Sequence, residues 1–459
     1  MNVLKFGGTS VGTVESLTHV KNIVETRQEP VIVVVSALGG ITDMLINAAQ
    51  LACSGSDSWH EIYGTIIERH RVVCEALVPC EARPRVWEQV CRELDRLKKY
   101  YTGIQLVEDL SERTLCNVVS FGERMSSILV TNIITGARRF YSPDFIKTEK
   151  WFGRNIAVAE LTERLIQDTF ISADYKVAVV PGFISADRDN GDITNLGRGG
   201  SDYTAALIAA ALDAETLEIW TDVDGFMTAD PRIIKDATVI PHLSFLESMD
   251  LCNFGAKVVY PPTIYPVFHK NIPIRILNTF NHTAPGTFIT DEHRVPVPQP
   301  FRGVTSIADV SVLEILPTSA FNASALRNRA LNVLSKKGIE ILLSVCMHDE
   351  DSPVRIVLRA ADAVRAELLL REDLSGEATP ETRPTLRTIS DMSTVTLVGE
   401  NLKTESSAAE RMLHTLHRGG IEILTSGRGS SGFAMTAVVP HSSITEALTL
   451  LHSHFLSPR

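Results

Sequence analysis

The chain has 459 residues, 44% of them hydrophobic, so we expect about two or three domains with ordinary buried cores. Its 44 basic and 55 acidic residues give a net charge of −11, which argues against nucleic acid and anionic membranes as partners. The seven cysteines contain no C-x-x-C pair and follow no signal peptide, so we expect reduced cytoplasmic thiols and no zinc site. No apolar run approaches the roughly 20 residues that span a membrane.

The first 55 residues repeat a pattern of strand, glycine turn and helix. Residues 3–6 are apolar except for Lys5 and precede Gly-Gly at 7–8, and the β-branched run 31–35 precedes Gly-Gly at 39–40. Unbroken β-branched runs are typical of parallel strands buried on both faces, and ligands bind at the carboxyl ends of such strands. We therefore predict an α/β fold with glycine turns at a ligand site.

Polar residues beside these turns are candidates for that site. Lys5 would point toward whatever the first turn holds, although a solvated lysine on an edge strand is the ordinary alternative. Thr42 or Asp43 is placed to cap the helix that follows the second turn.

Residues 58–135 show helical spacing of apolar positions without a clear strand, so we predict a helical subdomain. Glu123 lies beside a glycine in a helix that otherwise faces the core. Taken alone, such a glutamate is more often solvated than functional.

The stretch 191–207 reads G-D-I-T-N-L-G-R-G-G-S-D-Y-T-A-A-L and leads into an alanine-rich helix. Glycines allow backbone N–H groups to approach an anion, and the start of a helix adds the positive end of its dipole. Arg198 offers a planar fork for a carboxylate or phosphate, and Ser201 or Asp202 is placed to cap the helix. The alternative is a tight strand-to-helix connection that binds nothing.

Further strands are expected at 177–180, at 217–220 and at 272–277. The second of these runs into the polar turn Thr221–Gly225, and a lysine follows a glycine within Phe254–Val258. The α/β pattern therefore extends to about residue 290, and we predict one domain over 1–290.

A proline-rich segment at 291–303 predicts a linker, and an internal repeat lies beyond it. The motif G-I-E-I-L-x-S occurs at 338–344 and again at 420–426, each time after an amphipathic helix. Each copy predicts a β-α-β-β-α unit, one over 304–392 and one over 393–459. A strand within the first unit is expected to complete the sheet of the second.

Gly427–Gly432 matches the dinucleotide pattern G-x-G-x-x-G, but an apolar, strand-like segment follows it where a helix would be needed. We predict a hairpin turn there.

Several of these motifs together resemble aspartate kinases. The stretch K-F-G-G-T-S-V at 5–11 is similar to their N-terminal motif, and the 191–207, 220–225 and 254–258 stretches resemble further family motifs in the same order. The C-terminal repeats resemble the ACT domains of these enzymes, so the resemblance covers nearly the whole chain.

The resemblance implies an amino-acid kinase fold, a three-layer αβα sandwich around a mainly parallel sheet, followed by two interlocked α+β ACT domains of ferredoxin-like topology. It implies transfer of the γ-phosphoryl group of ATP to the β-carboxylate of L-aspartate, the first step toward lysine, threonine and methionine. Mg²⁺ would travel on the ATP phosphates, and no protein metal site is implied.

The resemblance also implies roles for individual residues. The catalytic lysines would be Lys5, on the transferring phosphoryl group, and Lys257, on the ATP phosphates. The ATP contacts would be Lys5, Phe6, Gly7, Gly8, Ser36, Thr221, Asp222, Met227, Arg232, Lys257 and Val258. The aspartate contacts would be Thr42, Glu123, Arg198, Gly199, Gly200, Ser201 and Asp202. Among them, Arg198 would bind the α-carboxylate and Glu123 the α-ammonium group.

Two positions depart from the family pattern: Met227 replaces a frequent tyrosine, with Phe226 beside it, and Tyr260 replaces the usual histidine. Because the chain stops after the second repeat, a monofunctional kinase is expected. Another kinase of this fold, with glutamate or UMP as acceptor, and a non-catalytic amino-acid sensor are the alternatives. We expect a homodimer through the ACT domains, with lysine favoured over threonine as an allosteric effector.

Overall fold

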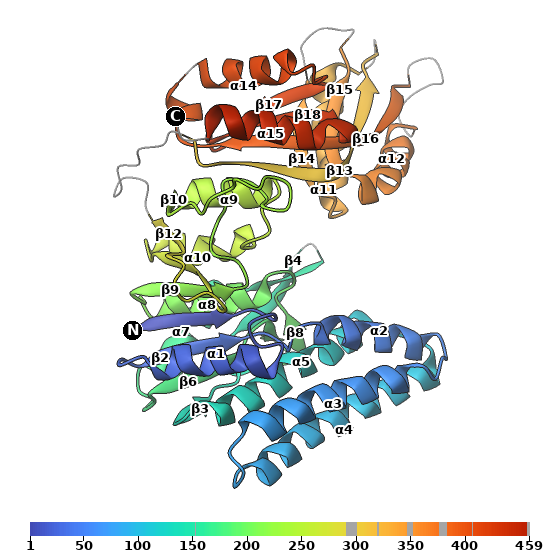
Figure 1. The fold of residues 1–459 in the computed structure, drawn as a ribbon. Helices are drawn as coiled ribbons and strands as arrows, with labels where there is room; N and C mark the ends of the chain where they lie inside the picture. The colour runs from blue at the N-terminus through green and yellow to red at the C-terminus, as the bar shows by residue number, and fades with distance from the viewer. Residues whose placement is uncertain are drawn as a thin grey trace. The chain divides into compact units, whose positions relative to one another are not determined.

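The computed structural model describes residues 1–151, 153–290, 301–318, 321–346, 352–375, 383–405 and 407–456 (Figure 1). They form two compact units. The N-terminal unit comprises Met1–Phe226 and Val258–Arg294, and the C-terminal unit comprises Met227–Lys257 and Val295–Arg459. Residues 227–257, expected within the 1–290 domain, thus cluster with the C-terminal repeats. Most of the predicted linker, up to residue 300, lies outside the described residues.

The N-terminal unit is built on a mainly parallel sheet in which the order β12-β11-β9-β1-β2-β6-β3 can be followed. Its strands are β1 (Asn2–Phe6), β2 (Val31–Val35), β3 (Ala137–Arg139), β6 (Val177–Pro181), β9 (Thr216–Thr221), β11 (Ile274–Asn278) and the antiparallel β12 (Thr287–Thr290). The register places Phe6 beside both Val35 and Trp220. The carboxyl ends of β1, β2 and β9 therefore lie at one edge.

A smaller sheet in the same unit has the strand order β5-β4-β7-β8. Its strands are β4 (Lys147–Trp151), β5 (Arg154–Ala157), β7 (Ile184–Asp187) and β8 (Ile193–Asn195). β8 leads into the glycine-rich stretch before α8.

Helices surround the large sheet. They are α1 (Val14–Glu25), α2 (Ile41–Cys53), α3 (Trp59–Leu77), α4 (Arg83–Val107), α5 (Glu112–Ile133), α6 (Ser142–Phe145), α7 (Ala159–Phe170), α8 (Gly200–Ala211), the 3₁₀ turn η1 (Pro261–Thr263) and α10 (Tyr265–His269). α3, α4 and α5 form the helical subdomain expected over 58–135. No helix in the described parts of the chain has the length and apolarity needed to cross a membrane.

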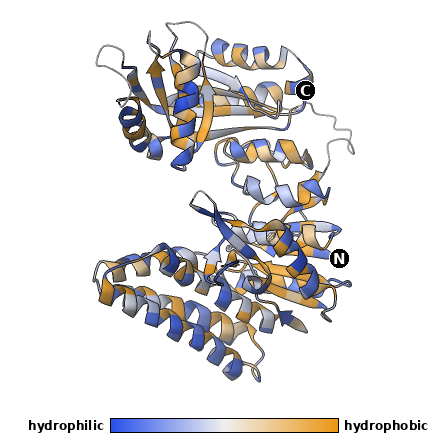
Figure 2. Ribbon diagram, turned by 180° about the vertical axis from the view of Figure 1, so that it is seen from behind, coloured by the Kyte–Doolittle hydropathy of each residue, from blue (hydrophilic) through white to orange (hydrophobic). Residues whose placement is uncertain are grey.

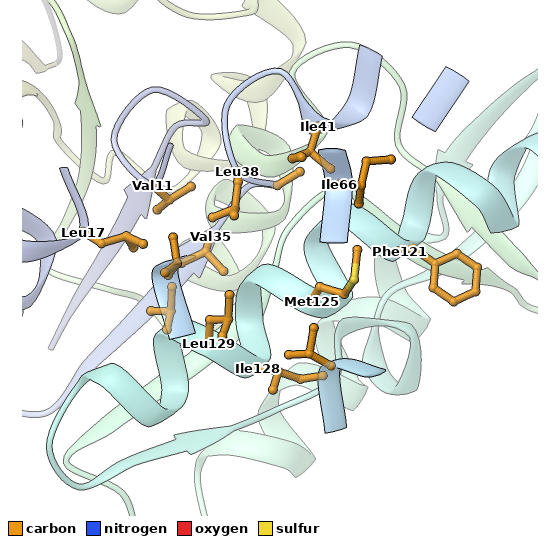
Figure 3. Close-up of a cluster of buried hydrophobic side chains, with 14 of the residues drawn as sticks. Val11, Leu17, Val35, Leu38, Ile41, Ile66, Phe121, Met125, Ile128 and Leu129 are labelled. Atoms are coloured by element: carbon orange, nitrogen blue, oxygen red, sulfur yellow. The ribbon is translucent and has the colours of Figure 1, made fainter. Parts of the chain in front are cut away.

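One apolar core joins the helical subdomain to the sheet. Ile66 of α3 and Met125 of α5 belong to the same buried cluster as Val35 of β2 and Leu38 of the following turn (Figure 3). Figure 2 shows apolar residues concentrated in the sheet strands, whereas the long helices alternate between apolar and polar residues. This shared core fixes the subdomain against the edge where the glycine turns lie.

In the C-terminal unit, residues 227–257 contribute β10 (His242–Ser244) and α9 (Phe245–Asn253). The segment after α9 approaches the C-terminal sheet closely at Gly255, which has a φ of 137°. A Cβ atom there would lie 2.0 Å from the carbonyl oxygen of Ser306. Glycine is therefore required at this position by space and by conformation.

The rest of the C-terminal unit has a six-stranded sheet in the order β14-β15-β13-β16-β18-β17. Its strands are β13 (Gly303–Leu316), β14 (Ile341–Val345), β15 (Val354–Arg359), β16 (Thr385–Val398), β17 (Thr425–Arg428) and β18 (Ala434–Pro440). The helices are α11 (Ala323–Lys336), α12 (Ala360–Ser375), α13 (Asn401–Thr404), α14 (Ser407–Arg418), the 3₁₀ turn η3 (His441–Ser443) and α15 (Ile444–Phe455).

The two repeats end their first helices in the same way. Gly338 and Gly420 take left-handed φ values of 72° and 74°, and the isoleucine after each is 4% exposed. β13 serves both halves of the sheet, because Val304 packs in the core with α14 and α15 whereas Leu313 packs with α11 and α12. The fold class predicted from the sequence, an α/β layer followed by α+β repeats, is confirmed.

The predicted hairpin is also confirmed. β17 and β18 pair antiparallel, with Thr425 opposite Val438 and Arg428 opposite Met435, so the G-x-G-x-x-G match lies in a turn between two strands.

Candidate active site

The candidate site lies where the turns after β1 and β2 continue the sheet's hydrogen bonds. The amide of Gly7 donates to the Trp220 carbonyl at 3.2 Å, and the amide of Ser36 donates to the Phe6 carbonyl at 3.2 Å. These bonds hold the first residues of both turns in line with their strands. Beyond them the chain bends into two facing turns.

The two turns touch through their glycines. A Cβ atom on Gly39 would lie 2.9 Å from the carbonyl oxygen of Gly8, and one on Gly8 would lie 3.4 Å from the carbonyl oxygen of Ala37. A distance of 2.9 Å is too short for a carbon atom against a carbonyl oxygen. Glycine at position 39 is therefore a condition for this approach of the two backbones.

Backbone donors remain free in both turns. Within the described residues, the N–H groups of Gly8, Thr9 and Ser10 and those of Leu38, Gly39 and Gly40 donate to no protein acceptor. Polar backbone groups need a partner, so these amides are available to water or to a ligand. Clustered N–H groups favour an anion.

Two helices begin at this edge without a side-chain cap. α2 follows Gly40, with φ of 79°, and α8 follows Gly199, with φ of 70°. The predicted caps are therefore wrong: neither Thr42 nor Asp43 caps α2, and neither Ser201 nor Asp202 caps α8. In both cases a left-handed glycine turns the chain directly into the helix, so these side chains already lie within its first turn.

Lys5 is paired with Asp202, a residue of the α8 first turn. Lys5 Nζ lies 2.6 Å from Asp202 Oδ1, and the two side chains are 11% and 12% exposed. A Cβ atom on Gly7 would lie 3.4 Å from the same Nζ, which places the ammonium group next to the glycine turn that follows β1. Burial of a lone cation would be costly, and the Asp202 carboxylate offsets this cost by pairing with Lys5. The alternative of a solvated lysine is excluded.

Glu123 of α5 reaches the second turn from the helical subdomain. Its side chain is buried, and Oε1 accepts a hydrogen bond from the Ala37 amide at 3.2 Å. Oε2 is buried without a partner in the described structure. Burial raises the pKa of Glu123 to about 8, against the opposing effect of the Ala37 hydrogen bond. A buried carboxyl group with a free oxygen is suited to receive a cationic ligand group.

The two glycines that follow Arg198, at the start of α8, pack closely against neighbouring residues. A Cβ atom on Gly199 would lie 2.4 Å from Tyr260 Cβ, and one on Gly200 would lie 2.8 Å from the ring of Phe183. Arg198 itself is exposed, and no hydrogen bond or ion pair of its side chain occurs among the described residues. Its fork is thus available to a ligand, and Tyr260, which replaces the family's usual histidine, is a neighbour of this loop.

Other predicted residues of the N-terminal unit lie at the end of β9, in the first turn of α2 and at the start of the unit's second segment. Thr221 ends β9, its hydroxyl donates to Asp222 at 3.2 Å, and its carbonyl accepts from the Thr279 amide at 2.8 Å. Thr42 is half-buried in the first turn of α2, and Val258 is half-buried at the start of the second segment of the unit.

Three predicted ATP contacts, Met227, Arg232 and Lys257, belong to the C-terminal unit. Arg232 forms a bidentate pair with Asp230, with Nη2 to Oδ2 at 2.6 Å, and these hydrogen bonds lower the pKa of the Asp230 carboxyl. The charge of Lys257 lowers it further, so Lys257 lies near this pair. Lys257 is exposed, and Met227 forms an isolated bridge with Val239.

Arg69 of α3 is a residue of this site that no sequence pattern indicated. Its guanidinium group donates to the carbonyl oxygens of Gly39, at 2.6 Å, and of Gly12, at 2.9 Å. A helical pattern shows which side of α3 is apolar but does not reveal a contact 30 residues away along the chain. Among the described residues, no group of three or more His, Cys, Asp or Glu side chains is arranged to hold a metal ion.

The facing glycine turns and the lysine–aspartate pair, at the carboxyl ends of parallel strands, form a site suited to a phosphorylated small molecule. A model of the amino acid kinase family matches residues 1–278, and the chain belongs to this family. An ACT domain model matches residues 395–455. The expected resemblance to aspartate kinases is confirmed by the relatives: chloroplastic aspartokinase 1 of Arabidopsis thaliana is 30% identical over 467 residues, which cover 99% of this chain and 80% of that protein.

The bifunctional aspartokinase/homoserine dehydrogenase of Haemophilus influenzae is 29% identical over 98% of this chain and 56% of its own length. The chain thus spans about half the length of several curated relatives it matches. Among solved structures, E. coli aspartokinase III with aspartate and ADP, in the R-state, is 25% identical with a TM-score of 0.85, and each chain is covered completely. The same enzyme with lysine and aspartate, in the T-state, is 26% identical with a TM-score of 0.78, again over both whole chains.

Proposed function

We propose that the chain is an aspartate kinase that transfers the γ-phosphoryl group of ATP to the β-carboxylate of L-aspartate. The observation that carries the proposal is the Lys5–Asp202 pair beside two turns with free backbone amides. Such an arrangement supplies positive charge and hydrogen-bond donors where phosphate oxygens would lie. The solved relative that contains aspartate and ADP supports both substrates.

The chemistry requires positioning and charge neutralisation but no enzyme nucleophile. A β-carboxylate oxygen of aspartate forms a bond to the γ-phosphorus while the bond to the ADP oxygen breaks, and ADP leaves with the electron pair. Lys5 would lie on the moving phosphoryl group, and the amides of the Gly8 and Gly39 turns would bind phosphate oxygens. Mg²⁺ would enter on the ATP phosphates.

Glu123 and Arg198 support an α-amino acid as the acceptor. The partnerless Oε2 of Glu123 would accept the α-ammonium group, and the exposed fork of Arg198 would bind the α-carboxylate. UMP has no ammonium group to match a buried carboxylate, which disfavours it. Glutamate differs from aspartate by one methylene, so the choice between them rests on the relatives.

The direct test is ATP turnover with aspartate, glutamate and UMP measured side by side, with hydroxylamine to trap the acyl phosphate as a hydroxamate. We expect ADP release and hydroxamate with aspartate alone. ADP release that does not respond to aspartate in the presence of Mg²⁺ would refute the proposal, and a response to glutamate would change the acceptor. The absence of turnover with all three acceptors would indicate a non-catalytic sensor. Met227, Arg232 and Lys257 stay predictions as ATP contacts.

We also propose that the C-terminal repeats assemble a homodimer and bind lysine as an inhibitor. The T-state relative that contains lysine supports the effector. The dimer is supported by Val364 and Leu368, which lie one turn apart on α12 and are 73% and 63% exposed. The effector must bind one arrangement of the protein better than another for its binding to change activity.

Light scattering and lysine or threonine titrations test this regulatory proposal. We expect a dimer, inhibition by lysine and a monomer after Leu368→Glu, with Leu106→Glu as a control because Leu106 is a similarly exposed leucine on α4. A monomeric wild type, or the absence of any effect of both amino acids on activity and thermal stability, would contradict it.

A further inference from the structure

We propose that Arg69 is a positioning residue that holds the two glycine turns in the orientation that binds phosphate. The inference rests on the proposed function, because it assigns a role within the same site. Arg69 lies on α3, outside the turns, and reaches both of them with one guanidinium group. Nη1 donates to the Gly39 carbonyl at 2.6 Å, and Nη2 donates to the Gly12 carbonyl at 2.9 Å.

The two hydrogen bonds fix the orientation of two peptide planes. In a trans peptide the carbonyl oxygen and the following N–H point in opposite directions. With the Gly39 oxygen directed at Arg69, the Gly40 amide points away from it, and this amide is one of the free donors of the second turn. With the Gly12 oxygen held in the same way, the Thr13 amide is directed to the Ser16 hydroxyl, which accepts it at 2.9 Å in the capping box of α1.

Arginine suits this task because its fork presents two donors in one plane. The two carbonyls belong to different turns whose backbones touch: a Cβ atom on Gly12 would lie 3.4 Å from the Gly39 nitrogen. One guanidinium group therefore joins the segment after β1 to the segment after β2. A lysine would offer a single ammonium group and would hold the two oxygens less firmly.

Among the described residues, no carboxylate competes for this guanidinium group. Arg69 has no ion pair within the described parts of the chain, whereas Arg71, two residues further along α3, pairs with Glu68 at 2.7 Å and Glu75 at 3.8 Å. The full charge of Arg69 thus adds to the positive potential at the turns. Arg71 offers a matched control on the same helix.

The helical subdomain contacts both the second turn, at Ala37, and the helix α2 that follows it, at Leu45. α5 brings Glu123 to the Ala37 amide, and α4 brings the Tyr101 hydroxyl to the Leu45 carbonyl at 3.2 Å. Arg69 differs from both because it also reaches the first turn. Its loss should therefore disturb the spacing of the turns while the shared apolar core keeps the fold intact.

The test compares Arg69→Ala, Arg69→Lys and the control Arg71→Ala in the full chain. Calorimetry measures Mg-ADP binding, turnover gives kcat and the KM values, and melting temperature reports folding. Because hydrogen bonds to a charged group are involved, we expect about 10-fold weaker Mg-ADP binding and a comparable fall in kcat for Arg69→Ala. Arg69→Lys should recover part of both, and Arg71→Ala should match the wild type.

The inference is overturned if Mg-ADP affinity and kcat of Arg69→Ala stay within about twofold of Arg71→Ala. If Arg69→Ala does not fold, Arg69→Lys decides: wild-type affinity and kcat in that variant would equally overturn it, and a loss of both with an unchanged melting temperature would support it. Mg-ADP binding separates this inference from the proposed function. A wild type that binds Mg-ADP yet phosphorylates no acceptor contradicts the proposed function alone, and one that binds no Mg-ADP overturns both.

Discussion

Glycine-rich turns occur in both units, and they end in opposite ways. The turn at 36–40 follows β2 and leads into α2, and its amides at Leu38, Gly39 and Gly40 donate to no acceptor in the described part of the chain. The turn between β17 and β18 uses its amides internally, because Gly429 donates to the Ala434 carbonyl at 2.9 Å and Gly432 to the Gly429 carbonyl at 3.0 Å. Glycine permits both outcomes, and the element that follows the turn decides whether donors remain for a ligand.

We expect the largest effect from removing the basic residue that precedes a glycine turn, with the two units compared. Lys5 of β1 is nearly buried beside Gly7, whereas Arg428 of β17 is exposed. Removing a preorganised charge from a phosphoryl-transfer site should lower kcat by about 10² to 10³-fold, so we expect this for Lys5→Ala and no change for Arg428→Ala. Steady-state kinetics with saturating ATP and aspartate measures it, and a kcat for Lys5→Ala close to the wild type would remove Lys5 from the chemistry.

The next largest effect is expected for Gly39→Ala, where a side chain lacks space, and it is compared with Gly432→Ala, where the backbone conformation is unfavourable for alanine. Gly39→Ala would place Cβ 2.9 Å from the Gly8 oxygen and push the turns apart, and a displacement of about 1 Å can cost about 10²-fold in kcat/KM. Gly432→Ala would strain a left-handed φ of 81°, costing about 1–2 kcal/mol of stability while leaving kinetics unchanged. Kinetics and chemical denaturation of both variants check this, and it fails if their effects are alike.

The smallest effect concerns the pH dependence of Glu123. Its pKa is about 8 when folded and near 4.5 ordinarily, so the folded protein keeps a proton that the unfolded chain releases. The resulting stabilisation is complete below about pH 4.5 and is lost as the pH rises through about 8. Glu123→Gln, which carries no titrating carboxyl group, should abolish this pH dependence of stability. Wild-type melting temperature should therefore fall relative to Glu123→Gln between those pH values.

The same variant should bind aspartate about 10-fold more weakly, with the KM for ATP unchanged. Because an α-ammonium group needs the ionised carboxylate, aspartate binding to the wild type should release a proton near pH 7. Calorimetry in buffers of different ionisation enthalpy measures that release. Proton release that persists in Glu123→Gln would assign it to another group.

The local elements could be predicted because their patterns are local. The β-branched run at 31–35 forms β2 with the expected bounds. The apolar segment after Gly432 forms β18, which pairs with β17 and confirms the hairpin. The caps failed because a left-handed glycine can start a helix unaided, which composition does not reveal. The pairing of Lys5 with Asp202 and the reach of Arg69 depend on tertiary packing, which a single sequence does not encode in any local pattern.

The membership of residues 227–257 in the C-terminal unit has a consequence for any attempt to shorten the protein. Ala229 and Ile234 share a buried cluster with Val304 and with α14 and α15. A chain cut after residue 303 would keep both side chains but lose most of the surface that covers them. Such a truncation would yield an aggregation-prone fragment instead of a freed catalytic module, so loss of regulation should be sought with point substitutions.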